Sequence, residues 1–306
     1  MIAGVLVLYY PKPLLLRRLL ESLEGQVDTI IAVDNTPEPD AHVLSWLQKF
    51  QSGSVCYHSL RTNKGIAEAQ NIGIAEATKA KCSHVLLLDQ DSALGPAMVA
   101  NLLLAEQILV EMGAKVAAVG PKYIDQKTRT SSFAVRYSGI RARKIPLVND
   151  LEGPIQTDIL IASGSLIRTH IFASVGLMRN DLFIDFVDTE WALRASSKGY
   201  RCYCVPDAIM SHSIGDAFVE VFGKKVHIHG DLRRFYRLRN AVYLLRLSTM
   251  GWRWRRYILF WLPYYSFLNI YIAHDKLQST RLLLKAIWEG LTGRLGPARE
   301  VEYEPR

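Results

Sequence analysis

His84-Val85-Leu86-Leu87-Leu88-Asp89-Gln90-Asp91-Ser92 is the stretch from which the fold can be predicted. Its four apolar residues, Val85 to Leu88, are typical of a strand buried on both faces of a parallel sheet. Two carboxylates follow where the strand ends, and ligands of open α/β sheets bind beyond the carboxyl ends of the strands. Asp89 and Asp91 are two residues apart, so in extended backbone their side chains point the same way. Such a pair suits Mg²⁺ or Mn²⁺ at a substrate phosphate, although it would also fit a plain strand-end turn.

Strands and helices alternate around this stretch. Apolar runs typical of strands lie at 2–10, 29–33, 55–60 and 116–120, and helical patterns lie at 14–23, 41–50, 65–79 and 96–112, the last with Pro96 in its first turn. This spacing predicts an α/β fold with a doubly wound, mostly parallel sheet. From 123 to 152 the pattern weakens, which favours a mobile loop or a short antiparallel excursion. A further apolar pattern at 158–167, a helix at 189–198 and a strand at 201–205 follow.

The excess positive charge lies near the C-terminus. Of the 37 Lys and Arg and 29 Asp and Glu, residues 231–306 hold 14 and 6, so the first 230 residues carry 23 of each sign. This distribution disfavours nucleic-acid binding by the main body and suggests a boundary between residues 1–230 and 231–306. The four cysteines are too irregularly spaced for a disulfide framework, and no signal peptide is visible, so a reducing compartment is expected.

Polar residues follow two other strands as well. Asp34 and Asn35 come after the second strand, and Arg61-Thr62-Asn63-Lys64-Gly65 comes after the third. An acid at such a position can accept hydrogen bonds from a ribose or a base, while Arg and Lys can neutralise phosphates and Gly allows close backbone approach. A simple turn and a helix entry are the structural alternatives. The first strand has no Gly-x-Gly-x-x-Gly after it, which disfavours a dinucleotide site.

A second acidic cluster lies at Phe183-Ile184-Asp185-Phe186-Val187-Asp188-Thr189-Glu190-Trp191. Asp188 precedes a helical pattern, which predicts that it is the N-cap, with Thr189 and Glu190 in the first turn. A helix N-terminus also favours the ionised carboxylate that a general base requires. Asp188 is therefore a candidate for both roles.

The basic tail contains Arg253, Arg255 and Arg256, followed by the uncharged run 257–273 with four tyrosines and Pro263. Aromatic and basic residues together suit the surface of an anionic membrane leaflet. The alternatives are a buried helix pair on one face of the sheet and, at the lower limit of length, a true membrane span.

Taken in order, six motifs make the chain resemble the family 2 glycosyltransferases, most closely the bacterial rhamnosyltransferases of lipopolysaccharide and other surface polysaccharides. They are Val-Asp-Asn (33–35), Asn-Lys-Gly-Ile-Ala-x-Ala-x-Asn-x-Gly (63–73), Leu-Leu-Asp-Gln-Asp-Ser (87–92), Ala-Ser-Gly-Ser-Leu-Ile (162–167), the 183–191 cluster and His-Ser-Ile-Gly-Asp (212–216). The resemblance covers about residues 1–245 and implies the GT-A fold, a Rossmann-like sheet, with a catalytic domain at 1–230 and a helical extension at 231–306. It also implies an inverting reaction with a nucleotide-diphospho-sugar and a divalent metal, Mg²⁺ or Mn²⁺.

The resemblance also implies roles for individual residues. Asp188 would be the catalytic base, Asp91 would bind the metal, and His212 would assist there, although alone it fits an ordinary loop histidine. Residues expected at the nucleotide-sugar are Tyr9, Asp34, Asn35, Arg61, Asn63, Lys64, Gly65, Asp89 and Gln90. Residues expected at the acceptor are Gly164, Ser165, Glu190 and Trp191. The family often has Glu-Asp where this chain has Val187-Asp188, so a role for the preceding acid is lost.

The expected function is transfer of L-rhamnose from dTDP-L-rhamnose to a saccharide or lipid-linked saccharide acceptor. The alternatives are the same fold using a UDP- or GDP-sugar, and a non-catalytic protein that binds carbohydrate or a membrane surface. The expected location is cytoplasmic and peripheral, at the inner face of the bacterial cytoplasmic membrane, with an anionic membrane surface as a partner and no nucleic acid.

Overall fold

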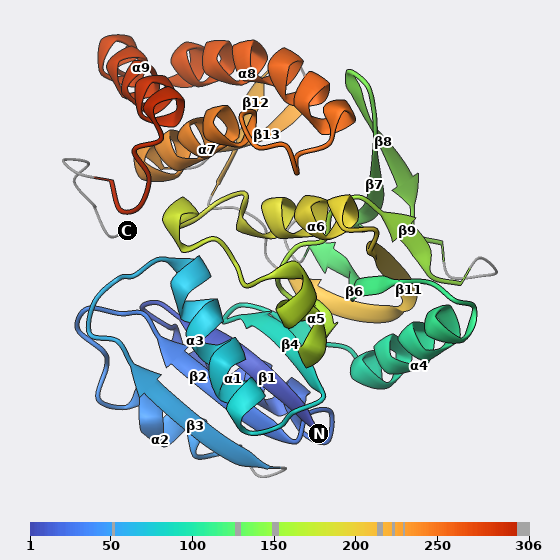
Figure 1. The fold of residues 1–306 in the computed structure, drawn as a ribbon. Helices are drawn as coiled ribbons and strands as arrows, with labels where there is room; N and C mark the ends of the chain where they lie inside the picture. The colour runs from blue at the N-terminus through green and yellow to red at the C-terminus, as the bar shows by residue number, and fades with distance from the viewer. Residues whose placement is uncertain are drawn as a thin grey trace.

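A large mixed sheet with helices on both faces forms the centre of the molecule (Figure 1). The computed structural model describes residues 1–50, 53–125, 130–148, 153–212, 217–221, 224–228 and 230–298. Within them the main sheet has nine strands in the order β3-β2-β1-β4-β10-β6-β11-β5, with β9 paired to β11. The bounds are β1 (Ile2–Leu8), β2 (Thr29–Asp34), β3 (Ser54–Ser59), β4 (His84–Asp89), β5 (Ala93–Leu94), β6 (Val116–Asp125), β9 (Ile155–Thr157), β10 (Leu166–Arg168) and β11 (Arg201–His212).

The order confirms a mostly parallel, doubly wound sheet. Strands β3, β2, β1 and β4 run parallel to one another, and β6 runs parallel to β11. The short strand β10 lies antiparallel between β4 and β6, and β5 and β9 are antiparallel to β11. The carboxyl ends of β1, β2 and β4 therefore meet at one edge of the sheet.

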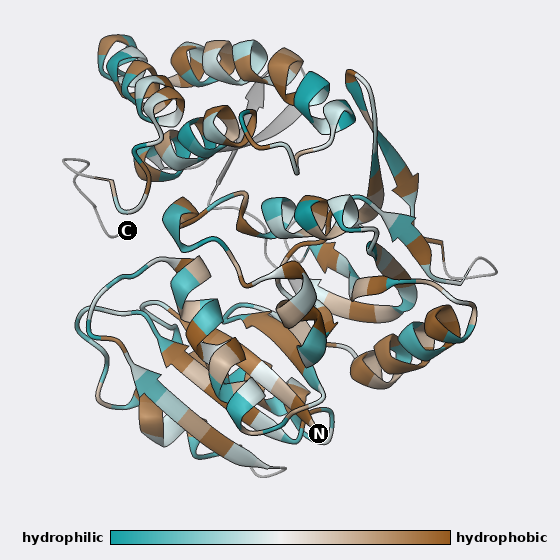
Figure 2. Ribbon diagram, in the orientation of Figure 1, coloured by the Kyte–Doolittle hydropathy of each residue, from teal (hydrophilic) through white to brown (hydrophobic). Residues whose placement is uncertain are grey.

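Strands β1, β2 and β4 are almost wholly buried because each contributes side chains to two cores. In β4, Val85 and Leu87 belong to one hydrophobic cluster, while Leu86 and Leu88 belong to the other. Figure 2 shows the sheet as the most continuous hydrophobic part of the ribbon. One face is covered by α1 (Pro13–Leu23), α2 (Val43–Leu47) and α4 (Met98–Glu111), and the other by α3 (Ile66–Lys79), α5 (Thr169–Val175) and α6 (Val187–Ser197). The prediction that Val85 to Leu88 is buried on both sides is confirmed.

Two boundaries differ from the sequence pattern. Helix α4 starts at Met98 because Ala97 is left-handed, with φ 55°, so Pro96 lies outside the first turn. Strand β11 runs on to His212, well beyond the apolar run 201–205, since it pairs with β6 along nearly its whole length.

The weakly patterned region contains an antiparallel hairpin, β7 (Phe133–Ser138) with β8 (Arg141–Pro146), so the antiparallel alternative holds for the residues described there. A second hairpin, β12 (Ala217–Val221) with β13 (Lys224–Ile228), precedes the C-terminal helices. Residues 126–129 and 149–152 of the weakly patterned region lie outside the described residues.

The C-terminal segment is helical, with α7 (Asp231–Leu244), α8 (Trp252–Ile272) and α9 (Lys276–Thr292). Ala241 of α7 and Trp254 and Ile258 of α8 lie in the same hydrophobic cluster as Val187 and Trp191 of α6. The three helices form a layer beyond α6 in Figure 1. No helix in the described ranges is both long enough and apolar enough for a membrane crossing.

Candidate active site

The register of the central strands brings the predicted donor residues together. Leu8 at the end of β1 pairs with Asp34 on one side, and its neighbour Val7 pairs with Asp89 on the other. Tyr9, Asn35 and Gln90 directly follow these positions. The Gln90 amide accepts from the Tyr9 N–H at 2.8 Å and donates to the Tyr9 carbonyl at 2.9 Å. Gln90 therefore fixes the backbone of Tyr9 at the carboxyl end of β1.

Asp34 is fully buried and bonded through both carboxylate oxygens. Oδ1 accepts from the Thr36 N–H at 3.0 Å, and Oδ2 accepts from the Tyr57 hydroxyl at 2.9 Å. Burial raises the pKa of Tyr57 to about 12, and the hydrogen bond to Asp34 adds to the shift. Tyr57, which no motif in the sequence indicated, therefore remains a hydrogen-bond donor at neutral pH. Asp34 exposes no surface of its own, so it acts on this region through the neighbours that it orients.

Two asparagines fold the loop after β3 against the end of β2. Asn35 donates from Nδ2 to Asn63 Oδ1 at 2.9 Å and accepts from the Lys64 N–H at 2.8 Å. Asn63 Oδ1 also accepts from the Gly65 N–H at 3.0 Å. Arg61 and Lys64 remain exposed beside this pair. The loop thus presents two exposed cations next to the carboxyl end of β2, and such cations can neutralise phosphates.

Gly65 joins the donor loop to the acidic cluster. It has φ 83°, and a Cβ at this position would lie 2.6 Å from the carbonyl oxygen of Phe183. The next residue, Ile66, donates its N–H to the same oxygen at 2.8 Å. Only glycine fits here, because both the backbone conformation and the close approach exclude a side chain.

The loop 183–186 has an unusual backbone conformation. As a result, α6 begins earlier than predicted and the predicted N-cap is wrong. Phe183, Asp185 and Phe186 all have positive φ, between 64° and 66°, so α6 begins at Val187. Asp188 is the second residue of the helix and not the N-cap, which is Phe186. The Asp188 Oδ1 accepts from the N–H of the adjacent Thr189 at 2.7 Å.

The surroundings of Asp188 favour its protonated form. Burial raises the pKa of this carboxyl, and the negative charge of Asp185 adds to the shift. Hydrogen bonds from the backbone N–H groups of Thr189 and Ala162 act in the opposite direction. The expectation that the helix N-terminus keeps the carboxylate ionised is wrong in direction, because desolvation is the larger effect. A raised pKa suits a general base, which must hold the proton that it accepts.

The segment around Gly164 connects the donor side to Asp188. Ser163 Oγ accepts from the Asp89 N–H at 3.2 Å and lies 2.6 Å from Ser92 Oγ. Gly164 donates to the Leu87 carbonyl at 2.8 Å, while the Leu87 N–H donates to the Ser165 carbonyl at 3.0 Å. The same segment supplies the Ala162 N–H to Asp188. Ser92 and Ser163, which were not among the predicted binding residues, therefore tie the two halves of the site together.

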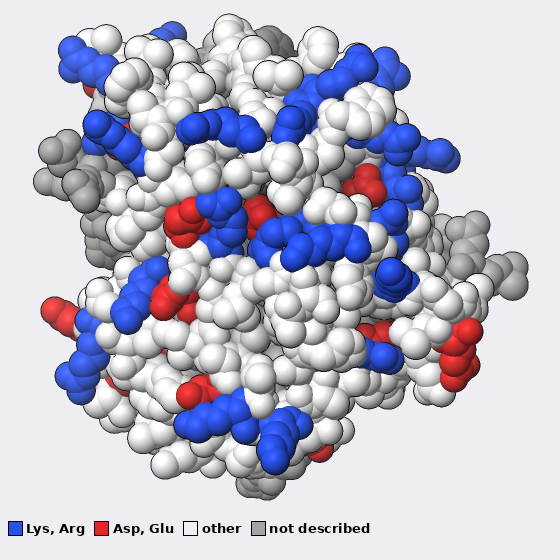
Figure 3. All heavy atoms as spheres, viewed as in Figure 1, with Lys and Arg blue, Asp and Glu red and all other residues white. Residues whose placement is uncertain are grey.

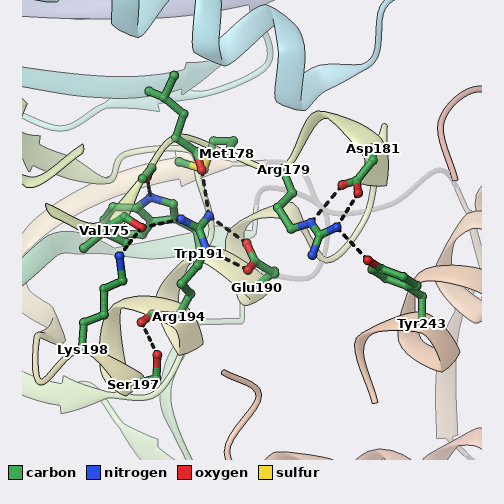
Figure 4. A network of polar contacts seen from close by, with 12 residues as sticks. Val175, Met178, Arg179, Asp181, Glu190, Trp191, Arg194, Ser197, Lys198 and Tyr243 are labelled. Carbon is green, nitrogen blue, oxygen red and sulfur yellow. Dashed lines mark hydrogen bonds and ion pairs between the residues drawn. The ribbon is translucent and has the colours of Figure 1, made fainter. Parts of the chain in front are cut away.

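All four residues predicted at the acceptor are buried. Ser165 donates its hydroxyl to the Ile161 carbonyl at 2.6 Å, and Gly164 is enclosed by Pro121 and Met210. Glu190, only 1 % exposed, accepts from Arg194 Nε at 2.8 Å and Nη2 at 2.9 Å. Trp191 donates to the Gly176 carbonyl at 2.8 Å (Figure 4). These residues contribute to packing and loop shape here, and their contact with an acceptor stays a prediction.

The two predicted metal ligands lie at one edge of the sheet. Asp91 is followed closely by β5, whose Ala93 pairs with Ser211, the residue before His212. His212 is the last residue of β11 and pairs through its backbone with Asp125; residues 213–216 of its motif lie outside the described residues. No cluster of three or more His, Cys, Asp or Glu suited to a metal occurs in the described part of the chain. A carboxylate such as Asp91 nevertheless fits Mg²⁺ or Mn²⁺, which proteins often hold with one or two carboxylates plus substrate phosphates.

The family is decided by comparison with known proteins. Residues 5–176, more than half of the chain, match the model of glycosyl transferase family 2. The chain belongs to glycosyl transferase family 2. It is 32 % identical over 302 residues to the dTDP-rhamnosyl transferase RfbF of Shigella flexneri, a match that covers 97 % of this chain and 98 % of that protein. The family and the predicted resemblance are thereby confirmed.

Solved structures of other glycosyltransferases confirm the GT-A fold. TarS of S. aureus superposes with a TM-score of 0.60 at 14 % identity, covering 95 % of this chain and 48 % of TarS. Its 1–349 fragment in complex with UDP-GlcNAc gives 0.56 at 16 % identity, covering 95 % and 81 %. GalNAc-T7 with UDP, GalNAc and Mn²⁺ gives 0.58 at 14 % identity, covering 95 % and 56 %. The chain thus spans about half the length of the TarS and GalNAc-T7 chains.

Proposed function

We propose that this family 2 glycosyltransferase is a rhamnosyltransferase that uses dTDP-L-rhamnose and inverts the anomeric centre. The observation that carries the proposal is the match to a dTDP-rhamnosyl transferase along nearly the full length of both chains. The carboxyl ends of β1, β2 and β4 agree with it, because hydrogen-bonding groups gather there, the neighbouring loop after β3 has two exposed cations, and Gly65 of that loop contacts the turn before Asp188. The acceptor is proposed to be a growing lipopolysaccharide or other surface polysaccharide.

In this proposal, residues at the carboxyl ends of the parallel strands bind the donor. The interlocked Asn35 and Asn63 shape the nucleotide pocket, and Asp34 acts through the Thr36 and Tyr57 groups that it orients. Arg61 and Lys64 neutralise the diphosphate from the exposed loop. Asp89 contributes at the ribose, next to the Tyr9 backbone that Gln90 fixes.

Asp188 acts as the general base. The acceptor hydroxyl attacks the anomeric carbon, its proton passes to the Asp188 carboxylate, and the bond to the diphosphate oxygen breaks on the opposite face. The two backbone N–H groups on Asp188 orient the carboxylate, while burial gives it the proton affinity that the step needs. The residues around it, Tyr123 and Tyr137 among them, remain protonated because burial raises the pKa of both hydroxyls.

The proposed cofactor is Mg²⁺ or Mn²⁺, held by Asp91 with His212 as a further ligand. When bound, such an ion supplies positive charge that stabilises the departing diphosphate. The GalNAc-T7 structure, which contains Mn²⁺ and UDP, supports this choice at the level of the fold.

A donor panel tests the proposal. Thermal shift is measured with dTDP-rhamnose, UDP-glucose and GDP-mannose, each with and without Mn²⁺, followed by assays of donor hydrolysis. We expect dTDP-rhamnose to give the largest stabilisation, because a ligand stabilises the folded state that binds it. Greater stabilisation by a UDP- or GDP-sugar would contradict the donor, and binding of dTDP-rhamnose without any turnover would contradict the enzymatic role.

We also propose that the enzyme works peripherally at the inner face of the cytoplasmic membrane, on a lipid-linked acceptor. The support is the charge distribution, since the whole net charge of +8 lies in residues 231–306. Juxtaposed basic and aromatic residues are typical of chains that bind anionic leaflets.

A further inference from the structure

The exposed sides of α8 and α9 are unusually apolar. On α8, Leu259, Phe260, Tyr264, Phe267 and Tyr271 are each between 52 and 61 % exposed. Phe260, Tyr264, Phe267 and Tyr271 recur every three or four residues, which places them along one side of the helix, and Leu259 directly precedes the first of them. On α9, Leu277, Leu284, Trp288 and Leu291 are 58 to 62 % exposed at the same kind of spacing. We call these nine residues the α8–α9 surface.

The opposite sides of both helices are firmly packed, so the exposure does not come from loosely attached helices. Ile258, Tyr265 and Leu268 of α8 are buried. Helix α9 packs mainly along α7, where a Cβ on Gly290 would come within 2.6 Å of the Arg239 carbonyl oxygen. Each helix is therefore held with one side inward and its apolar stripe outward. Figure 2 shows hydrophobic segments along both helices.

Basic side chains surround this surface. Helix α8 contains no Asp or Glu, and at its start Arg253 and Arg256 lie 5.5 and 5.7 Å from the ring of the exposed Trp252. Arg281 is exposed between Leu277 and Leu284 on α9. Arg255 differs, because it is half-buried and donates to the Leu247 carbonyl. In Figure 3 the top of the molecule, where α8 and α9 lie, is mainly uncharged, and Lys and Arg are more evident there than Asp and Glu.

We propose that the α8–α9 surface inserts its apolar side chains into an anionic lipid bilayer. Exposed aliphatic and aromatic residues flanked by arginines match the two layers of a leaflet, the acyl region and the anionic headgroups. A second copy of the chain fits less well, because it would bring like-charged arginines together. A membrane-spanning α8 fits less well too, because the inner side of this helix packs in the protein core. The proposal deepens the membrane location proposed above and rests on it.

Vesicle co-sedimentation tests the surface. The full chain is mixed with vesicles of phosphatidylglycerol and phosphatidylcholine, at low and at high salt. We expect the Phe260→Gln, Phe267→Gln double variant to bind about tenfold more weakly or worse, because two rings no longer leave water. The control is Leu104→Gln, Met112→Gln, which removes one apolar side chain on α4 and one at its C-cap, 59 and 79 % exposed. This control should bind like the wild type.

A second pair of variants separates charge from insertion. Arg253→Gln, Arg256→Gln should weaken binding by about fivefold for each arginine at low salt and much less at high salt. The control is Arg141→Gln, Arg143→Gln on the exposed hairpin β7–β8. The Phe260, Phe267 variant should lose affinity at both salt concentrations, since its contribution is not electrostatic.

Several results would overturn the inference. They are absence of vesicle binding by the wild type, equal binding by the Phe260, Phe267 variant and its control, and a dimer in light scattering that this variant abolishes. Donor hydrolysis in solution is measured for every variant and should be unchanged. If hydrolysis of dTDP-rhamnose is absent in the wild type while vesicle binding behaves as expected, the proposed reaction fails and the membrane surface remains.

Discussion

At the scale of single residues, the proposed role of Asp188 as the general base can be tested directly. Asp188→Asn preserves the shape and can still accept the N–H groups of Thr189 and Ala162, but it cannot accept a proton. Transfer should fall by roughly 100-fold or more. Donor affinity, measured by titration with dTDP, should stay close to the wild-type value, and a collapse of that affinity would move Asp188 to the donor site.

The raised pKa of Asp188 also predicts a pH dependence of stability. The folded protein holds this proton more tightly than the unfolded chain, so the carboxyl costs stability as pH rises from the unfolded pKa through the raised folded pKa. Asp188→Asn removes this cost and should melt at a higher temperature than the wild type at neutral pH. The difference should shrink as the pH is lowered toward the unfolded carboxyl range. A variant less stable than the wild type at neutral pH would show that the carboxylate is stabilising.

A variant of Asp91 tests the proposed metal site independently of the proposed base. Asp91→Asn replaces a carboxylate with a neutral amide, a poorer ligand for a hard cation. The stabilisation that Mn²⁺ adds to donor binding in thermal shift should be lost, while stabilisation by the donor alone should persist. Metal-dependent turnover equal to that of the wild type would remove Asp91 from the metal site.

At the scale of elements, the contact between Gly65 and Phe183 couples the donor loop to the turn before Asp188. Gly65→Ala meets both a left-handed backbone and the Phe183 carbonyl, so it should cost roughly 2 to 4 kcal/mol and weaken donor binding. The matched control is Gly113→Ala, which has φ 81° with no atom within 4 Å of the added Cβ. It should cost only about 1 kcal/mol, for the backbone alone. Equal losses in chemical denaturation would show that the contact with Phe183 is unimportant.

Elements with a strong periodic pattern were predictable, and those decided by long-range pairing were not. The apolar runs at β1, β2, β3 and β4 lie within a residue or two of the structural strands, and β1, β2 and β4 are buried on both faces. The full length of β11 was not visible, since its second half is held by pairing with β6. The start of α6 was misplaced because nothing local indicates that Phe183, Asp185 and Phe186 adopt left-handed backbone.

The candidate site likewise contains residues that the sequence pattern predicted and residues that it did not. Residues at strand ends, such as Asp34 and Asp89, followed from the topology that the pattern implied. Tyr57 and Ser163 did not, because their roles depend on side-chain contacts between segments that are distant in the chain. Glu190, predicted at the acceptor, is buried in an ion pair with Arg194 one helical turn later, and its position in the sequence indicates neither its burial nor that contact.

At the scale of the whole molecule, the C-terminal helices support the catalytic loop as well as the proposed membrane surface. Asn240 of α7 is fully buried and donates to the carbonyls of Leu182, Ile184 and Asp185 at 2.9 to 3.0 Å. Arg233 of the same helix forms an ion pair with Asp185 at 2.7 Å. The strained turn that places Asp188 is thus held by a helix from the basic segment.

This packing predicts that residues 1–230 do not form an independent folded unit. Truncation after residue 230 would expose the core residues that Ala241, Leu244 and Trp254 cover, and it would leave three carbonyls of the catalytic turn without their donor. The truncated chain should be poorly soluble or should bind the dye ANS strongly, and it should lose cooperative thermal unfolding. The full-length Asn240→Leu variant isolates the polar part of the effect and should lose about 2 kcal/mol or more in chemical denaturation. A cooperative, active fragment would instead establish the domain boundary near residue 230.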